Sequence, residues 1–358
     1  MNQRQIIIAM SGGVDSSVAA ALLVEQGYDV TGAFMINYDD KAEGHGECWR
    51  PDYRDAVRVA AKLGIPLLRI DCTKEYREQV IGYMLKEYQA GNTPNPDVMC
   101  NKYIKFGVWL EKLKEKGFDR IATGHYANIE KKNGQYFLTT AKDENKDQTY
   151  FLHQLNQTQL SHIEFPLGKY TKDEVRLLAK KYHLPTAEKA ESMGICFIGE
   201  ISINDFLKDN RIIVQPGNII KDETEEVIGE HEGLPFYTIG QRHGFTQTGG
   251  DQPLFILEKH TQQNELIVGY EDNPKLYKTD LIIQDMHWII EEEPVFPFDA
   301  QVRFRHRQKK QPCRIQKQKN EIMIHCTQPQ KAITPGQFVV IYKNSVCLGG
   351  GPVTNELP

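Results

Sequence analysis

The chain has 358 residues, and because domains average about 150 residues this length predicts two or three of them. Hydrophobic residues make up 40% and charged residues 25% of the sequence, a composition that excludes a disordered or fibrous protein. With a formal net charge of −5, no apolar membrane span and no basic, apolar leader, we expect a soluble cytoplasmic protein rather than a uniformly basic nucleic-acid binder.

The N-terminal part of the chain alternates short apolar runs with amphipathic stretches of helix length, which is the pattern of βαβ units. In chain order we predict strands at residues 5–10, 29–36, 66–71 and 120–125, and helices at residues 16–26, 54–63 and 103–116. This alternation predicts the α/β class, with a doubly wound parallel sheet.

After residue 198 the helical periodicity fades, and short β-rich runs are separated by Pro-Gly, Gly-Gly and Asn-Pro turns. Runs at residues 254–258 and 265–268 predict a small central β-rich domain. Runs at residues 300–305, 314–316, 321–326 and 337–342 predict a small C-terminal β-barrel or sandwich. The predicted domains are residues 1–205, 206–277 and 278–358.

A glycine-rich turn separates the first predicted strand from its helix, with the sequence Ser-Gly-Gly-Val-Asp-Ser-Ser at residues 11–17. Backbone N–H groups and the helix dipole favour an anion at such a turn, and adjacent glycines let the backbone approach a phosphate closely. The turn lacks the spacing of a Walker A loop and of a dinucleotide site. The alternative is a simple turn with a Ser or Asp helix cap.

The seven cysteines are an odd number, which in a chain without a leader predicts reduced thiols and no disulfide framework. No Cys-x-x-Cys or His-Glu-x-x-His spacing indicates a metal site, and we predict none. Cys100 follows Pro94 and Pro96 and is expected in or near the first turn of a helix, where the helix dipole favours its thiolate form. The alternative interpretations are a small buried hydrophobic residue for Cys100, a helix N-cap for Asp97 and a core strand around Cys196.

Several motifs in order carry a resemblance to known proteins. Residues 11–17 resemble the PP-loop of the ATP-pyrophosphatase superfamily. Together with residues 95–106, 146–152, 165–168, 194–199, 240–242 and 335–337, they are similar to the tRNA-specific 2-thiouridylases over nearly the whole chain.

This resemblance implies an ATP-dependent 2-thiolation of the wobble uridine of tRNA. ATP, with Mg²⁺, would transfer AMP to the 2-oxygen and release pyrophosphate. Cys196 would carry a persulfide, Cys100 would be its partner thiol, and Asp97 would act as acid or base. The sequence leaves open whether the persulfide attacks directly or Cys100 first releases hydrosulfide. Only the fold can bring the two cysteines together.

The resemblance also implies binding residues and partners. It implies ATP contacts by Ala9, Met10, Ser11, Gly12, Gly13, Val14, Asp15, Ser16, Met35 and Gly124. It implies contacts with the target base by Asn95, Pro96 and Asp97, and with the rest of the tRNA by His125, Lys146, Asp147, Gln148, Arg305, His306 and Gln337. The implied partners are tRNA, through its anticodon region, and a cysteine desulfurase or sulfur-relay protein as persulfide donor.

The region from residue 301 to residue 325 holds eight basic residues and one acidic residue. Arg303, Arg305 and Arg307 alternate with other residues, so in a strand their side chains would share one face and could bind phosphate. Affinity for tRNA should then fall as the salt concentration rises. Two other functions remain open: a PP-loop enzyme that amidates a free nucleotide, and a tRNA-binding sulfur carrier without ATP chemistry.

Overall fold

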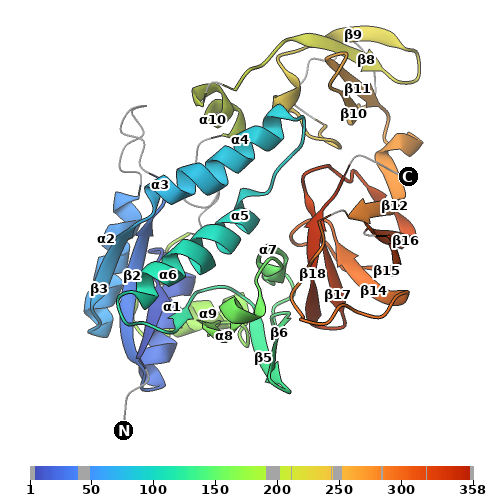
Figure 1. Cartoon of the computed structure of the whole chain (residues 1–358). Helices are drawn as coiled ribbons and strands as arrows, with labels where there is room; N and C mark the ends of the chain where they lie inside the picture. The colour runs from blue at the N-terminus through green and yellow to red at the C-terminus, as the bar shows by residue number, and fades with distance from the viewer. Residues whose placement is uncertain are drawn as a thin grey trace.

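The computed structural model describes residues 5–38, 49–190, 202–210, 212–242, 244, 252–283, 285–319 and 321–354. These residues form a five-stranded, a four-stranded and a nine-stranded sheet. In Figure 1 the helix-rich N-terminal part lies on the left and the β-rich C-terminal part on the right, and the four-stranded sheet projects at the top. No helix in the described ranges is long and apolar enough to cross a membrane.

The five-stranded sheet is parallel and has the order β3-β2-β1-β4-β7. Its strands are β1 (Gln5–Ala9), β2 (Asp29–Ile36), β3 (Leu67–Asp71), β4 (Ile121–Ala122) and β7 (Ile163–Glu164). The chain moves outward from β1 to β3 and then returns to the other side of β1, which places a topological switch point between β1 and β4.

Helices cover both faces of this sheet because successive strand residues point to opposite sides. Ile6 and Ile8 pack on the side of the first helix group, whereas Ile7 packs with the second group. The first group consists of α1 (Val14–Glu25), α2 (Arg50–Leu63) and α9 (Lys172–Lys181). The second group consists of α3 (Thr73–Tyr76), η1 (Arg77–Ile81), α4 (Gly82–Gln89), α5 (Pro96–Met99), η2 (Cys100–Val108) and α6 (Trp109–Lys114). The expected doubly wound α/β fold is confirmed.

The four-stranded sheet follows α10 (Ile203–Asp209) and has the order β10-β11-β8-β9. Its strands are β8 (Gly217–Lys221), β9 (Glu226–His231), β10 (Phe255–His260) and β11 (Glu265–Gly269), with η3 (Leu234–Phe236) between the two hairpins. Ile219, Ile256, Leu266 and Val268 are buried and pack within the same core cluster as residues of the N-terminal part.

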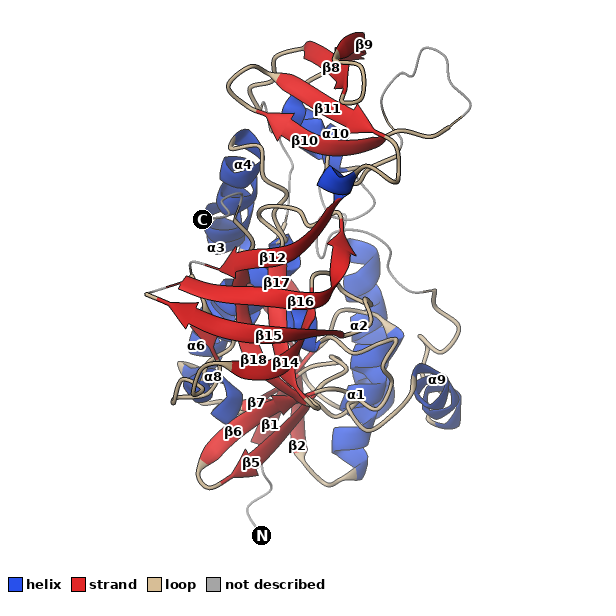
Figure 2. Ribbon diagram, turned by 90° about the vertical axis from the view of Figure 1, so that its right-hand side faces the viewer, coloured by secondary structure: helices blue, strands red, loops and turns tan. Residues whose placement is uncertain are grey.

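The nine-stranded sheet forms a C-terminal barrel-type unit (Figure 2). Its C-terminal strands are β12 (Tyr277–Ile283), β13 (His287–Trp288), β14 (Phe298–Arg303), β15 (Gln311–Gln318), β16 (Glu321–Lys331), β17 (Phe338–Lys343) and β18 (Val346–Pro352), preceded by η4 (Pro274–Leu276). An isolated bridge between Ile283 and Val353 brings the end of β12 to the end of β18, so the sheet curls back on itself.

Two strands of this sheet come from the N-terminal part of the chain. They are β5 (Asn128–Lys132) and β6 (Gln135–Thr139), which form a hairpin before α7 (Thr149–Leu152) and α8 (Gln157–Ser161). Thr139 of β6 pairs with Val346 of β18, and Thr140 N–H donates to the Ser345 carbonyl at 2.9 Å. The hairpin therefore joins the N-terminal half of the chain to the barrel by backbone hydrogen bonds.

Candidate functional site

The first candidate site is the turn between β1 and α1. Gly13 is the N-cap of α1 and offers no side-chain acceptor, and among the described residues no side chain caps the first N–H groups of the helix. Gly12 has φ +74°, and a Cβ there would lie 2.2 Å from the carbonyl oxygen of Asp52. The alternative of a Ser or Asp cap is therefore wrong. The turn requires glycine and leaves a positive helix end open to an anion.

Other strands bring further predicted ATP residues to this turn. Ala9, at the end of β1, pairs with Ala33 of β2, and Met35 lies two residues farther along β2. Gly124 follows β4, and a Cβ on it would lie 2.7 Å from the backbone nitrogen of Ser16. The structure thus gathers these positions at the carboxyl edge of the parallel sheet, on either side of its switch point.

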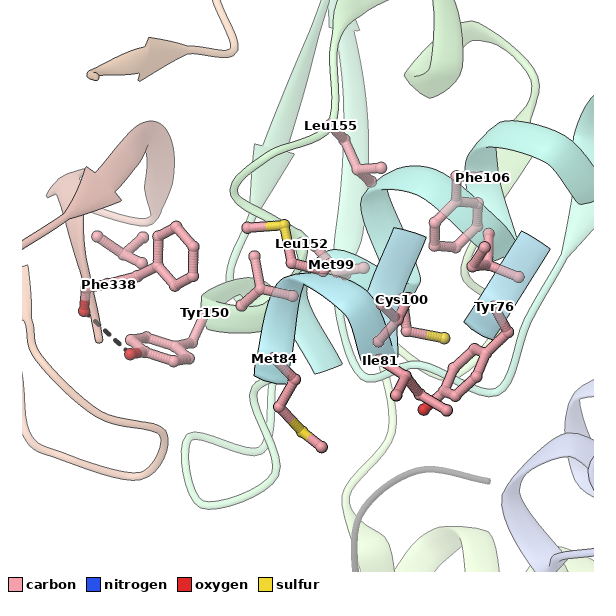
Figure 3. Packing of buried hydrophobic residues seen from close by; sticks show 14 of the residues in the cluster. Tyr76, Ile81, Met84, Met99, Cys100, Phe106, Tyr150, Leu152, Leu155 and Phe338 are labelled. Carbon is pink, nitrogen blue, oxygen red and sulfur yellow. Dashed lines mark hydrogen bonds between the residues drawn. The ribbon is translucent and has the colours of Figure 1, made fainter. Parts of the chain in front are cut away.

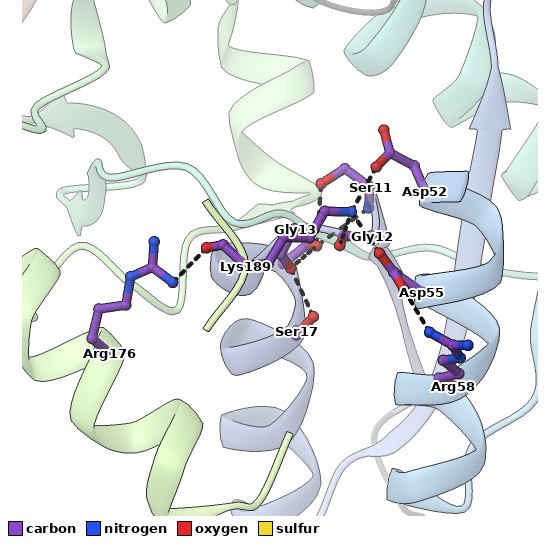
Figure 4. A network of polar contacts seen from close by, with 10 residues as sticks. Ser11, Gly12, Gly13, Ser17, Asp52, Asp55, Arg58, Arg176 and Lys189 are labelled. Atoms are coloured by element: carbon purple, nitrogen blue, oxygen red, sulfur yellow. Dashed lines mark hydrogen bonds and ion pairs between the residues drawn. The ribbon is translucent and has the colours of Figure 1, made fainter. Parts of the chain in front are cut away.

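Lys189 reaches the turn from a distant part of the chain (Figure 4). Its Nζ donates to the Gly12 carbonyl at 3.1 Å and lies 2.7 Å from a carboxylate oxygen of Asp52 and of Asp55. Partial burial opposes the charged ammonium, but the two carboxylates outweigh it and raise the pKa of Lys189. Lys189 is therefore a permanent cation on the outer side of the loop.

Lys172 is a second lysine at the loop, and its Nζ lies 2.7 Å from Asp15 Oδ1. The Tyr126 hydroxyl donates to the same oxygen at 2.8 Å. Sequence reasoning missed both lysines because they lie more than 150 residues from the motif. One signal was present: residues 11–17 contain no basic side chain, so a loop that binds phosphate has to obtain its cations elsewhere.

The second candidate site is the segment that begins α5. The side-chain oxygen of Asn95 accepts a hydrogen bond from the Val98 N–H at 3.4 Å, which makes Asn95 the N-cap. Pro96 then occupies a first-turn position, where its missing N–H costs nothing. Asp97 lies in the first turn, so the alternative that it caps the helix is wrong.

Cys100 follows α5 directly and opens the π-helical segment η2. The residue is 1% exposed and belongs to the apolar cluster that contains Tyr76, Ile81 and Met84 (Figure 3). The second predicted thiol, Cys196, lies outside the described residues. The pairing of Cys100 with Cys196 therefore stays a prediction.

Gln337, directly before β17, holds the backbone that leads into α5. Its Nε2 donates to the carbonyls of Thr93 at 2.9 Å and Pro94 at 3.1 Å, and its Oε1 accepts from Asn95 Nδ2 at 3.4 Å. The structure thus brings together one residue predicted to contact tRNA and one predicted to contact the target base. Both amide hydrogens of Gln337 point at protein carbonyls.

A cavity of about 150 Å³ lies where the three parts of the chain meet. Its lining includes Thr93 of the N-terminal part, Thr238 of the central part and Arg305 of the barrel. The hydroxyls of Thr93 and Thr238 are 3.3 Å apart, and the Thr93 N–H donates to the Pro335 carbonyl at 2.9 Å. The segment before α5 is therefore fixed from both β-rich parts.

Asp147 lies in the core and not at an exposed RNA-binding surface. Its carboxylate pairs with Arg303 and accepts hydrogen bonds from Ala141 N–H at 3.1 Å and the Thr149 hydroxyl at 2.8 Å. The Asp147 side chain is fully enclosed. Both carboxylate oxygens of Asp147 thus already bind these neighbours, and the expected contact between Asp147 and tRNA stays a prediction.

The expected strand face of three arginines is also wrong. Strand β14 ends at Arg303, which is buried against Asp147, and Arg307 has φ +65°, outside the β region. Arg305 is exposed, and its guanidinium donates to the carbonyls of Lys331 at 2.7 Å and Ala332 at 3.2 Å. The chain turns away at residue 304, so these side chains point to different surroundings.

Two of the remaining residues predicted to contact tRNA are histidines with buried rings. His125 Nδ1 is 2.7 Å from the Thr123 hydroxyl, and burial, with Lys105 nearby, lowers the His125 pKa. The ring of His306 lies 4.6 Å from that of Phe151, and burial lowers the pKa of His306 to about 4. Both imidazoles are therefore neutral at pH 7.

Gln148 uses its side-chain oxygen to accept from the Tyr126 N–H at 3.0 Å, next to the first candidate site. Lys146 is partly exposed beside it. Within the described ranges, no group of three or more His, Cys, Asp or Glu side chains could hold a metal ion.

Comparisons with known proteins cover the whole chain. Three family models match in succession: the tRNA methyl transferase HUP domain at residues 4–200, the tRNA methyl transferase PRC-barrel domain at residues 204–270 and the Aminomethyltransferase beta-barrel domain at residues 278–353. The tRNA-specific 2-thiouridylase MnmA of Shouchella clausii is 47% identical over 98% of this chain and 96% of its own length. Those of Halalkalibacterium halodurans and Geobacillus thermodenitrificans are each 46% identical, over 99% and 98% of this chain and 96% and 95% of their own lengths.

Proposed function

Because the chain belongs to the family of tRNA-specific 2-thiouridylases, we propose that it replaces the 2-oxygen of the wobble uridine of tRNA by sulfur in an ATP-dependent reaction. The observation that carries the ATP-dependent step is the glycine-lined N-terminus of α1, which no side chain of the described residues caps. It supplies N–H donors where a triphosphate needs them and lies at the edge of the sheet that also carries Met35 and Gly124.

In the first step the uridine 2-oxygen attacks the α-phosphorus of ATP, AMP becomes attached to that oxygen, and pyrophosphate leaves. The loop binds the β- and γ-phosphates, which orients the α-phosphorus and stabilises the charge of the leaving group. Mg²⁺ would enter with the nucleotide and would offset the negative charge of its phosphates. This activation is needed because AMP is a much better leaving group than the original carbonyl oxygen.

In the second step the outer sulfur of a Cys196 persulfide bonds to C2 and AMP departs with the oxygen. The Cys100 thiolate then attacks the inner sulfur, which forms a Cys100–Cys196 disulfide and leaves the outer sulfur on the base. The alternative route, in which Cys100 first releases hydrosulfide, gives the same products. Either route consumes one persulfide and requires an external thiol to reduce the disulfide. Asp97, one turn before Cys100, acts as the base that takes the proton lost by the uridine ring when its 2-oxygen attacks phosphorus.

The roles proposed for the partners follow from this chemistry. A cysteine desulfurase or a sulfur-relay protein supplies the persulfide, and tRNA binds through its anticodon region. Asn95, Pro96 and Asp97 contact the target base, which leaves the anticodon stack to reach a buried thiol. Since tRNA and ATP are its substrates, we place the reaction in the cytoplasm.

The test is mass spectrometry of nucleosides from tRNA incubated with the protein, ATP and a persulfide-generating desulfurase. We expect 2-thiouridine with the wild-type protein and none without ATP. Cys100→Ser and Cys196→Ser should each reduce product at least about 100-fold, since each removes a sulfur that bonds in the reaction. Cys313→Ser is the matched control, because Cys313 is also buried but lies in the barrel, and its product yield should stay close to wild type.

Two results would contradict the proposal. Full turnover by both cysteine variants would indicate a nucleotide-amidating PP-loop enzyme, which needs no paired thiols. Sulfur bound to the protein without any ATP-dependent product would indicate a carrier.

A further inference from the structure

Side chains hold two carbonyl groups of the phosphate loop in place. Ser16 and Ser17 donate their hydroxyls to the Gly13 carbonyl at 3.1 and 2.7 Å. Lys189 donates to the preceding carbonyl, that of Gly12, at 3.1 Å (Figure 4). Two successive carbonyls of the loop thus have fixed directions.

A fixed carbonyl also fixes the next N–H, because the two point in opposite directions across a trans peptide bond. The Gly12 carbonyl points at Lys189, so the N–H of Gly13 points away from Lys189. The Gly13 carbonyl points along the helix at the two serines, so the N–H of Val14 points outward from the helix end. Consecutive N–H groups oriented in this way form an anion-binding concavity.

Lys189 is itself held firmly. Arg176 of α9 donates to the carbonyls of Ala187 at 3.0 Å and Lys189 at 2.7 Å. On the other side, the Lys189 ammonium contacts Asp52 and Asp55 of α2. The lysine therefore connects α9, the loop and α2, and its position does not depend on the loop alone.

We propose that Lys189 is a positioning residue for nucleotide activation: its ammonium holds the Gly12 carbonyl outward and thereby orients the Gly13 N–H toward the phosphates of ATP. The inference rests on the proposed function, since it assumes that ATP binds at this loop. It adds a residue that lies outside the loop motif and that acts through the backbone. In the absence of the ammonium, the peptide between two glycines is free to rotate and the N–H is no longer preorganised.

The experiment compares Lys189→Met, which keeps the length and removes the donor, with Lys189→Arg, which restores a cationic donor. We expect Lys189→Met to raise the KM for ATP about 10-fold or more, the effect of losing one charge-assisted hydrogen bond. Its affinity for pyrophosphate, measured by calorimetry, should fall by a similar factor. Affinity for tRNA should be unchanged, and Lys189→Arg should recover most of the loss.

The matched control is Lys180→Ala, which removes a surface lysine of α9 that pairs with Glu188 and does not contact the loop. This variant should leave the KM for ATP and the affinity for pyrophosphate unchanged. An unchanged KM for ATP in Lys189→Met would overturn the proposal, and so would equal losses of pyrophosphate and tRNA affinity, which indicate a general loss of structure. If the wild-type protein itself makes no 2-thiouridine, it is the proposed function that fails, whereas the pyrophosphate measurement still tests Lys189.

Discussion

The environment of the Asp147 side chain is determined by residues that are distant in the sequence. In the sequence it stands in a polar run, Lys146-Asp147-Gln148, that is typical of a surface loop. In the structure its carboxylate is enclosed and pairs with Arg303, a residue of the barrel. The buried pair thus links the segment directly before α7 to the end of β14, and we expect it to contribute to the stability of the fold.

We expect Asp147→Asn to destabilise the protein by about 3 kcal/mol, because it leaves the buried guanidinium of Arg303 without a countercharge. Urea unfolding measures this as a lower midpoint. The double variant Asp147→Leu with Arg303→Met should recover much of the loss, since no buried charge is left unpaired. If Asp147→Asn were as stable as the wild type, the pair of Asp147 and Arg303 would have to be exposed to water in solution.

The candidate site was predictable at the residue scale only where the signal was local. The glycines and serines of residues 11–17 are contiguous, so their chemistry could be inferred from the sequence. Lys189 could not, because its contact with Gly12 depends on the packing of α9 against α1. The predicted partnership of Cys100 and Cys196 remains a prediction.

At the scale of elements, the N-terminus of α1 lies against the residue Gly124 that follows β4. Gly124 lies over the backbone nitrogen of Ser16, in the first turn of α1. Any side chain at Gly124 would occupy the space from which an anion approaches this helix end. Because the residue after the short strand β4 is a glycine, that space stays empty.

We expect Gly124→Ala to raise the KM for ATP about 10-fold or more, because the new methyl group would lie 2.7 Å from the Ser16 nitrogen and has to displace the backbone. Steady-state thiolation at varied ATP concentration checks this. Gly82→Ala, at the first residue of α4, is the control and should be neutral or slightly stabilising, since its Cβ meets ordinary contact at 3.6 Å. A normal KM in Gly124→Ala would place the nucleotide elsewhere.

Sequence patterns predicted the buried elements better than the exposed ones. The run Ile6-Ile7-Ile8 and the amphipathic stretch that became α2 carry strong periodic signals, and both elements formed as expected. The hairpin β5–β6 was missed because its strands are short and partly exposed, with a charged first strand. The prediction of an arginine face was wrong because the strand ends at Arg303. The chain then turns, and Arg307 has a positive φ that does not belong to a strand.

At the scale of the whole molecule, the segment from Thr93 to Asn95 is the point where all three parts meet. Gln337 of the barrel and Thr238 of the central part both contact it. The first turn of α5, with Asp97, follows at once, and Cys100 comes one turn later. The β-rich parts therefore determine the position of the proposed thiol chemistry, in addition to any contact with tRNA.

We expect Gln337→Ala to lower kcat for thiolation about 10-fold or more, since it frees the backbone before α5 and small displacements of reacting groups are costly. Affinity for tRNA, measured by filter binding, should change little because both amide hydrogens of Gln337 face protein carbonyls. Gln328→Ala, on the exposed side of β16, is the control. Lost tRNA affinity with a normal kcat would instead support the direct tRNA contact that the resemblance implied.

The hairpin β5–β6 has a consequence for biosynthesis. Thr139 and Val346, which pair across the junction, are separated by more than half of the chain. A ribosome that has finished the N-terminal half of the chain has already released both hairpin strands, yet β18, the strand that pairs with β6, is still untranslated. The nascent protein must therefore carry an unpaired β edge through most of its synthesis, and the sheet is completed only when the last strands emerge.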